Sequence, residues 1–406
     1  MALTIKYKKS LIITLLYLAY MLSYSVMPHF VPEVYLQMFR NVMILTTFVM
    51  FFKFLSLKLN LLTFMFVLIC MLSVIFNDTH PIFQAKIRYV FFLIIFFGLG
   101  LILKPKLSSD QLINFDQISR INTIVIILSF VSYFTYIGSL GRGNFSGVLN
   151  HSNTLGPIAA LVCIDKILQL YRGEKKLKTF FLFLISFFVL ILSGSRASLG
   201  TLLISLIFIG IYIYRIKFIV WGTGIGLVLI SAFFVLKEYN HLLIPEESLK
   251  NRYRPRTVFE KGFDNTRFLL WEERIDEFLV SPLLGSGFSS VNINAIPKNS
   301  VSYDLESGSI QPGSGYLGIL SMLGIFGFLA FVFLIFYAIL KLYFKRNQYL
   351  EKNFLMVISI LLFILIHSVF EGYLISSGNI LFLIFWIAIS YIFNKQETNN
   401  ENIISN

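Results

Sequence analysis

The chain is built from many apolar runs, each close to the length of a bilayer-crossing helix and separated from the next by a short polar segment. A transmembrane helix needs about 20 predominantly apolar residues, or slightly fewer when flanking side chains snorkel. The pattern therefore predicts an all-α polytopic membrane protein with about 12 transmembrane helices. The predicted spans are residues 11–27, 38–55, 61–76, 88–103, 121–140, 155–170, 179–193, 199–214, 218–236, 315–340, 354–370 and 379–393.

Composition supports this interpretation and excludes the main alternatives. Charged residues make up 14% of the chain and mean hydropathy is +0.78, whereas soluble domains carry roughly 25% charged residues. A soluble enzyme, a secreted disulfide scaffold and a disordered chain are all excluded. Cys70 and Cys163 both fall inside apolar runs, so they define no disulfide framework. The first run lacks a small-residue cleavage site, so we interpret it as a retained helix.

Basic residues between the spans indicate the orientation. When the N-terminus is placed in the cytoplasm, the cytoplasmic segments hold 20 of the 34 Lys and Arg residues, and the short outer segments hold five. This asymmetry is the pattern that positive residues show in membrane proteins. The net charge of +13 is therefore a topology signal, and no nucleic-acid partner is implied. We expect a multi-pass protein of the bacterial cytoplasmic membrane with both termini inside.

One extramembrane segment is long enough to carry a site. We expect a large extracytoplasmic loop at residues 237–313, between transmembrane helices 1–9 (1–236) and 10–12 (314–393), with a cytoplasmic polar tail at 394–406. The loop contains an amphipathic helix that ends at Pro282. The predicted apolar face of that helix carries Trp271, Ile275, Phe278 and Leu279, and the opposite face carries Glu272, Glu273, Asp276 and Glu277.

Several common catalytic motifs are missing from the sequence. It has no GxxxxGK[ST] loop, no HExxH, no paired CxxC, no GxSxG and no Asp-x-Asp pair. We therefore expect no ATP hydrolysis and no zinc chemistry, and we assign no metal or other cofactor.

Two arginines on the predicted outer side are the strongest candidates for a site. Arg196 lies in Ser-Gly-Ser-Arg-Ala-Ser, where small neighbours let a ligand approach its guanidinium. Arg267 opens the amphipathic helix of the loop, where its charge faces the positive end of the helix dipole. A planar guanidinium suits phosphate oxygens, so both predict an anionic ligand. The alternatives are an interfacial snorkelling arginine and a solvated loop arginine.

Further polar residues lie on the same predicted side. Arg142, Asn150 and His151 lie before the sixth span and offer hydrogen bonds to a polar substrate, although a plain surface loop is equally compatible. His367 and Glu371 are predicted to share a helix face as a base and its orienting partner. The alternative for this pair is a satisfied contact between helices.

The order of these motifs resembles the O-antigen ligase and polymerase (Wzy-like) family over roughly residues 140–385. The resemblance rests on SGSRAS between two spans, on Arg267-x-x-x-Trp271 followed by Pro-Leu-Leu-Gly-Ser-Gly, and on Gly313-Ser314 nine residues before Gly-Ile-Phe-Gly. It implies a metal-independent, membrane-embedded glycosyltransferase of the GT-C type, acting at the outer face on undecaprenyl-diphosphate-linked sugars. It also implies catalytic roles for Arg196 and Arg267, and we expect substrate contacts at Trp271 and Ser314.

The sequence departs from the ligase pattern at one position. Ligases of the family begin the last motif with His, and this chain has Gly313 there. We therefore predict a polymerase that extends a capsule, exopolysaccharide or O-antigen chain from lipid-linked repeat units, by direct and inverting attack of a sugar hydroxyl. The expected partners are the undecaprenyl-diphosphate-linked donor and acceptor, membrane lipid, a flippase and a chain-length regulator. The alternatives are a ligase, a lipid-linked sugar flippase or transporter, and a membrane scaffold subunit.

Overall fold

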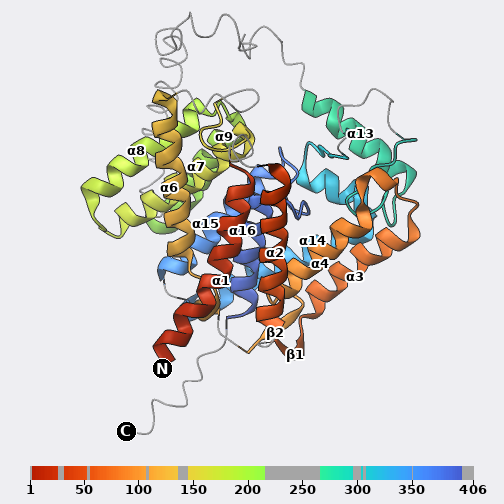
Figure 1. Cartoon of the computed structure of the whole chain (residues 1–406), viewed down its shortest axis with the longest axis horizontal. Coiled ribbons are helices and arrows are strands. Elements are labelled where there is room, and N and C mark those ends of the chain that lie inside the picture. The colour runs from red at the N-terminus through yellow and green to blue at the C-terminus, as the bar shows by residue number, and fades with distance from the viewer. Residues whose placement is uncertain are drawn as a thin grey trace, which may run out of the picture. The chain divides into compact units, whose positions relative to one another are not determined.

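The computed structural model describes residues 2–25, 32–52, 55–106, 109–135, 145–214, 266–295, 303–304, 308–349 and 351–395, and most of them are helical (Figure 1). The chain divides into two compact units. Unit 1 comprises Met1–Val125 and Thr266–Asn406, and unit 2 comprises Ile126–Asn265. We describe each unit by itself.

Unit 1 holds most of the helices and a small sheet. Its elements are α1 (Ala2–Ser23), α2 (Glu33–Phe52), β1 (Leu55–Leu59), α3 (Leu61–Phe76), η2 (Pro81–Phe83), α4 (Ala85–Gly98), β2 (Leu103–Pro105), α5 (Ser109–Leu112), the start of α6 (Phe115–Phe134), α13 (Thr266–Val280), α14 (Gly315–Phe344), η4 (Arg346–Gln348), α15 (Glu351–His367) and α16 (Ile380–Phe393).

Each predicted span other than residues 218–236 overlaps one of the helices described, and 218–236 lies outside the described residues. Among the described residues, four helical segments are long and apolar enough to cross a membrane, and several apolar helices are shorter. The structure therefore agrees with a polytopic helical membrane protein, while the number of twelve spans stays a prediction. The four long segments are Pro81–Gly98, Phe115–Phe134, Ser152–Tyr171 and Gly315–Phe344.

The small sheet corrects the all-α expectation. β1 and β2 pair antiparallel, with Leu55 opposite Pro105 and Leu59 opposite Leu103. The predicted spans 38–55 and 88–103 both run into these strands, because an apolar run alone does not separate a strand from the end of a helix.

α16 forms the centre of unit 1. All of its residues from Ile380 to Phe393 are buried, as expected for a helix that is apolar on every side. It contacts α1, α14 and α15. The Trp386 ring lies 4.5 Å from that of Phe96 and 6.1 Å from that of Phe66, and its indole N–H donates to the Leu374 carbonyl at 3.0 Å.

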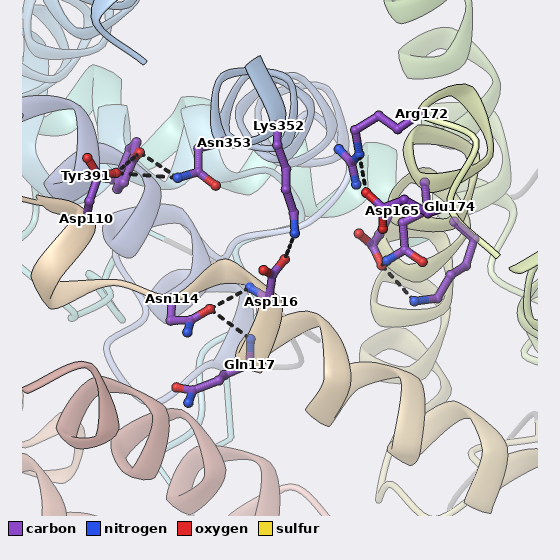
Figure 2. Close-up of polar contacts among 12 residues, drawn as sticks. Asp110, Asn114, Asp116, Gln117, Asp165, Arg172, Glu174, Lys352, Asn353 and Tyr391 are labelled. Carbon is purple, nitrogen blue, oxygen red and sulfur yellow. Dashed lines mark hydrogen bonds and ion pairs between the residues drawn. The ribbon is translucent and has the colours of Figure 1, made fainter. Parts of the chain in front are cut away.

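Contacts within unit 1 join segments that the alternation of spans puts on the same side of the membrane. On the predicted inner side, Asp110 accepts a hydrogen bond from Tyr391 at 2.5 Å, and Lys352 pairs with Asp116 at 2.5 Å (Figure 2). On the predicted outer side, Arg88 donates to the Gly308 carbonyl at 2.7 Å. The choice of which side is cytoplasmic stays a prediction from the charge asymmetry.

α14 is interrupted at Gly324, whose backbone is not helical (φ 67°, ψ −169°). The loop at residues 282–287 fills the break. Backbone N–H groups of Ser286 and Gly287 donate to the Ser321 and Met322 carbonyls at 2.8 and 3.1 Å, and the Ile325 N–H donates to the Pro282 carbonyl at 2.8 Å. The groups that the break frees are thus paired with the loop, as buried backbone requires.

Unit 2 contains α7 (Ser152–Tyr171), which packs against α8 (Lys176–Leu192) and α9 (Arg196–Tyr214). The second half of α6 contributes Phe130, whose ring lies 5.8 Å from that of Phe188. A buried ion pair on α7 joins the Asp165 carboxylate to the Lys166 ammonium group at 2.8 Å. The Asp165 side chain is drawn in Figure 2.

Candidate functional site

The first candidate region lies at the start of α13, in unit 1. Arg267 is the second residue of this helix and forms an ion pair with Glu371, which follows α15. The Arg267 side chain is 34% exposed and that of Glu371 is 19% exposed. The structure therefore brings together two residues that the sequence predicted to be catalytic, and it leaves the guanidinium partly open.

A turn at residues 368–370 precedes Glu371, and this turn is tied to the start of α14. α15 ends at His367, so Glu371 does not continue its helical face and the predicted sharing of one face is wrong. The Ser368 carbonyl accepts a hydrogen bond from the Gly315 N–H at 2.7 Å. Burial raises the pKa of Glu371 above its ordinary value, although the Arg267 charge and hydrogen bond act in the opposite direction.

Trp271 lies one turn after Arg267 and fixes the segment before α14. Its indole N–H donates to the Gly313 carbonyl at 3.2 Å. Gly313 has φ +68°, and a Cβ there would lie 2.7 Å from the Leu270 Cβ. Both the backbone conformation and the space at this position therefore require glycine.

Ser314, a predicted substrate contact, is 3% exposed. Its hydroxyl caps α14 by accepting from the Leu317 N–H at 3.5 Å, and it lies 3.4 Å from the Ser368 carbonyl. The structure thus gives this side chain a capping role. Its contact with substrate stays a prediction.

His367 is enclosed by aromatic rings. It is 1% exposed and stacks between Phe363, at 5.5 Å, and Tyr373, at 5.6 Å. The ring is shielded from any substrate in this structure. Of the two predicted base candidates, Glu371 is therefore the better placed.

Sequence reasoning missed a buried ion pair on α13. Arg274 and Glu277 pair at 2.7 Å, and both side chains are fully buried. Glu277 also accepts a hydrogen bond from the Asn292 N–H at 2.7 Å. Burial raises the pKa of Glu277 to about 7.

The predicted faces of α13 must therefore be corrected. Glu277, grouped with the acidic face, is buried, whereas Ile275 and Leu279 of the predicted apolar face are exposed. A sequence signal for the buried pair was present: Arg274 and Glu277 carry opposite charges at positions i and i+3, which share a helix face.

The second candidate region lies in unit 2, at the start of α9. Arg196 is the first residue of this helix and is exposed. Ser195 precedes it and accepts from the Ser198 N–H at 3.4 Å, with the two hydroxyls 2.7 Å apart. Within the part of the chain that the structure describes, no ion pair involves Arg196.

The first turns of α7 pack against the same turn. A Cβ on Gly156 would lie 2.5 Å from the Ser195 Cβ, so α7 approaches SGSRAS closely at this glycine. Asn150 and His151 directly precede α7. His151 is exposed, and its carbonyl accepts from the Thr154 N–H at 3.0 Å. Arg142 lies outside the described residues.

Within the described ranges, no group of three or more His, Cys, Asp or Glu side chains is placed to hold a metal ion.

Comparison with protein families adds one finding. Residues 181–332 match the family model described as O-antigen ligase. The match begins in α8, contains Arg196 and Arg267, and ends in α14. No curated protein matches the chain.

This match confirms the resemblance to the O-antigen ligase family. It supports a membrane enzyme of O-antigen or glycan assembly, in agreement with the apolar helices. It does not distinguish a polymerase from a ligase.

Proposed function

We propose that this chain, which resembles O-antigen ligases, is a polysaccharide polymerase of the cytoplasmic membrane. It joins undecaprenyl-diphosphate-linked oligosaccharide repeat units into a capsule, exopolysaccharide or O-antigen chain at the outer face. The donor's diphosphate leaves as the new glycosidic bond forms, so the reaction needs no separate energy source.

The observation that favours polymerase over ligase is the surroundings of Gly313. This position corresponds to the histidine of ligases in the resembling motif. Its φ of +68° and the 2.7 Å approach of Leu270 exclude a side chain, and its carbonyl is held by Trp271. The packing around this position is thus adapted to glycine and leaves no room for the imidazole of a histidine.

In the proposed mechanism, Arg267 binds the donor diphosphate, and the family resemblance implies the same role for Arg196. The acceptor hydroxyl oxygen attacks the anomeric carbon, the bond from that carbon to the diphosphate oxygen breaks, and the anomeric configuration inverts. The diphosphate departs with the bonding electrons, and the guanidinium groups stabilise the charge that develops on it.

Glu371 takes the proton that the acceptor hydroxyl loses. The partly exposed Arg267 can bind phosphate oxygens in place of the Glu371 carboxylate, which frees that carboxylate. Its raised pKa suits a general base, because a base works best when its pKa lies near the working pH.

The second candidate is a ligase that transfers a finished glycan to another acceptor. The description of the matching family favours it. The two arginines and Glu371 would have the same roles, and only the acceptor would differ. A flippase is the third candidate, with no catalytic role for either arginine.

Surface polysaccharide and its lipid-linked intermediates test the choice between these functions. We would compare cells that carry the wild type, a deletion, Arg267→Ala or Arg172→Ala, by gel separation and mass spectrometry. Arg172 pairs with Glu174 at 2.7 Å on the predicted inner side, so it serves as the matched control.

A polymerase predicts single lipid-linked repeat units at the outer face in the deletion and in Arg267→Ala, with long chains retained in Arg172→Ala. Full-length polymer that stays on the lipid carrier would indicate a ligase. Repeat units trapped at the cytoplasmic face would indicate a flippase.

A further inference from the structure

α13 is amphipathic in the opposite sense to a helix that covers a protein core. Its fully buried side chains include the ion pair of Arg274 and Glu277. Five of its apolar side chains are nevertheless exposed, among them Leu279 at 67% and Val280 at 61%, whereas Leu270 is buried. The other exposed apolar residues on this helix are Phe268, Leu269 and Ile275.

Three of these residues form one stripe. Phe268, Ile275 and Leu279 are spaced by seven and four positions, which places them on one side of an α-helix. Glu272 and Asp276, both exposed, lie along one edge of the stripe. An apolar stripe bordered by charged residues is typical of a helix that lies in a membrane interface.

The stripe is continuous with the exposed apolar surface of α14. Leu283, three residues beyond α13, is 59% exposed, and its carbonyl accepts from the Phe326 N–H at 3.4 Å. Phe326, Leu329 and Phe333 are exposed along α14. α14 is long and apolar enough to span a membrane, so these side chains face lipid.

The break at Gly324 sets the level of α13 relative to the bilayer. Residues 325–344 of α14 form a continuous helix of about 30 Å at 1.5 Å per residue, which matches the thickness of the hydrocarbon core. A hydrocarbon core that covers residues 325–344, in place of the 315–340 predicted from the sequence, puts Phe326 at one of its edges. The loop that fills the break follows directly from α13, and Figure 1 shows α13 beside α14.

We propose that α13 lies in the outer lipid–water interface of the membrane, with Phe268, Ile275 and Leu279 inserted among the lipids and Glu272 and Asp276 at the level of the head groups. The occupant of this surface is the lipid bilayer, because the surface continues the lipid-facing side of a spanning helix. The buried ion pair on the opposite side fixes the rotation of α13, so the apolar stripe cannot turn toward the protein.

This placement bears on the proposed function. Arg267 lies in the first turn of α13, so an interfacial helix holds its guanidinium at the level of lipid head groups, where the diphosphate of a lipid-linked sugar lies. That consequence rests on the proposed function, whereas the position of the helix in the membrane does not.

Spin labels measure the position of α13 directly. The purified full-length chain would be reconstituted into vesicles of phosphatidylcholine and phosphatidylglycerol, with single cysteines replacing Ile275 or Leu279. Phe333→Cys on α14 is the lipid control and Lys175→Cys, on an exposed turn, is the water control. Cys70 and Cys163 are buried, so they remain unlabelled.

The ratio of collisions with oxygen to collisions with a water-soluble nickel chelate gives the depth of each label. We expect the ratios at positions 275 and 279 to lie several-fold above that at 175 and to approach that at 333. Ratios equal to that at 175 would overturn the proposal by placing α13 in water. Labels shielded from both reagents would overturn it by showing that another protein segment covers the stripe.

Quenching by brominated lipids provides a second measurement on the same cysteines, labelled with a fluorophore. Strong quenching at 279 and weak quenching at 175 are expected. Equal and weak quenching at both positions would contradict insertion. Both measurements report position and not activity, so their failure is distinguishable from failure of the polymerase proposal.

Discussion

The two candidate arginines lie in similar local structures but in different surroundings. Arg267 is the second residue of α13 in unit 1, and Arg196 is the first residue of α9 in unit 2. Arg267 is partly buried and pairs with Glu371. Arg196 is exposed, and none of the described residues forms an ion pair with it.

This difference indicates how each arginine meets a ligand. A cation in the first turn of a helix is unfavourable because the helix dipole is positive there. At Arg267 the Glu371 carboxylate compensates for this effect, and an incoming phosphate must displace it. At Arg196 a phosphate meets an open guanidinium. Under the proposed function, both arginines stabilise the leaving diphosphate, and Arg267 in addition couples its binding to release of Glu371.

Replacement of either arginine by Ala is expected to have the largest effect. Loss of one group that stabilises developing charge costs roughly 10²–10³-fold in rate, so polymer should fall to trace levels in both variants. Lys keeps the charge and loses the bidentate geometry, so both Lys variants should also be strongly impaired. Repeat-unit counts by mass spectrometry measure the effect.

Near-normal polymer length in both Lys variants would refute the role of the arginines as a diphosphate clamp. Arg172→Ala, the control outside the site, should keep normal polymer. An equal loss in that control would show that the arginine effects are not specific.

Glu371→Gln separates a base from a purely positioning residue. As a base, Glu371 must be deprotonated, so the wild-type rate should rise with pH through its raised pKa, at higher pH than for an ordinary glutamate. Gln keeps an oxygen for Arg267 but accepts no proton, so the rate should fall by roughly 10²-fold and that pH limb should vanish.

A pH–rate profile of the purified enzyme measures both quantities. If Glu371 only positions Arg267, the Gln variant should keep most of the rate and the same profile. That result would leave the proposed proton transfer without an acceptor.

The break in α14 predicts the next effect, on stability. A Cβ on Gly324 would lie 2.3 Å from the Leu283 carbonyl oxygen, and φ there is +67°. Gly324→Ala should therefore lower the free energy of unfolding by about 3 kcal/mol, through steric overlap and backbone strain. Unfolding of the purified chain in detergent measures the change.

Gly200→Ala is the matched control, because this glycine lies inside α9 and a Cβ there meets no atom within 4 Å. It should be neutral or stabilising by up to about 1 kcal/mol. Similar destabilisation in both variants would contradict the role assigned to the break.

The smallest expected effect concerns the buried Glu277. Its folded-state pKa of about 7 lies above the ordinary value of 4.5. The stability it contributes is therefore fully present below about pH 4.5 and is lost as pH rises through 7. A pKa raised from 4.5 to about 7 corresponds to roughly 3 kcal/mol in full and to about 2 kcal/mol between pH 5 and pH 8.

Glu277→Gln should remove this dependence on pH. The free energy of unfolding of the wild type and the variant, measured in detergent at pH 5 and pH 8, would show the difference. An unchanged dependence in the Gln variant would assign the effect to other groups.

Much of the fold follows from apolar runs and charge asymmetry. The runs located the helices, and the alternation of sides agrees with contacts such as Arg88 to Gly308 and Lys352 to Asp116. The same alternation put Arg267 and Glu371 on one side, where the structure pairs them.

Other features depend on packing that periodicity does not contain. The break at Gly324 exists because residues 282–287 pair with its backbone, and a run of apolar residues carries no sign of that partner. From the sequence, His367 is a candidate base at the end of a span. In the structure, its ring stacks between those of Phe363 and Tyr373. The alternation of apolar and charged residues along α13 did not show which side is buried: Glu277 is buried in the pair with Arg274, while Ile275 and Leu279 are exposed.

Polymerisation by the purified protein tests the central claim most directly. The chain would be reconstituted into vesicles with an undecaprenyl-diphosphate-linked repeat unit as both donor and acceptor, in the presence of EDTA, and the products would be sized by mass spectrometry. The account predicts lipid-linked products of two and more repeat units from the wild type and loss of these products in both Arg196→Ala and Arg267→Ala. Absence of such products from folded wild-type protein, or undiminished products from both variants, would contradict it.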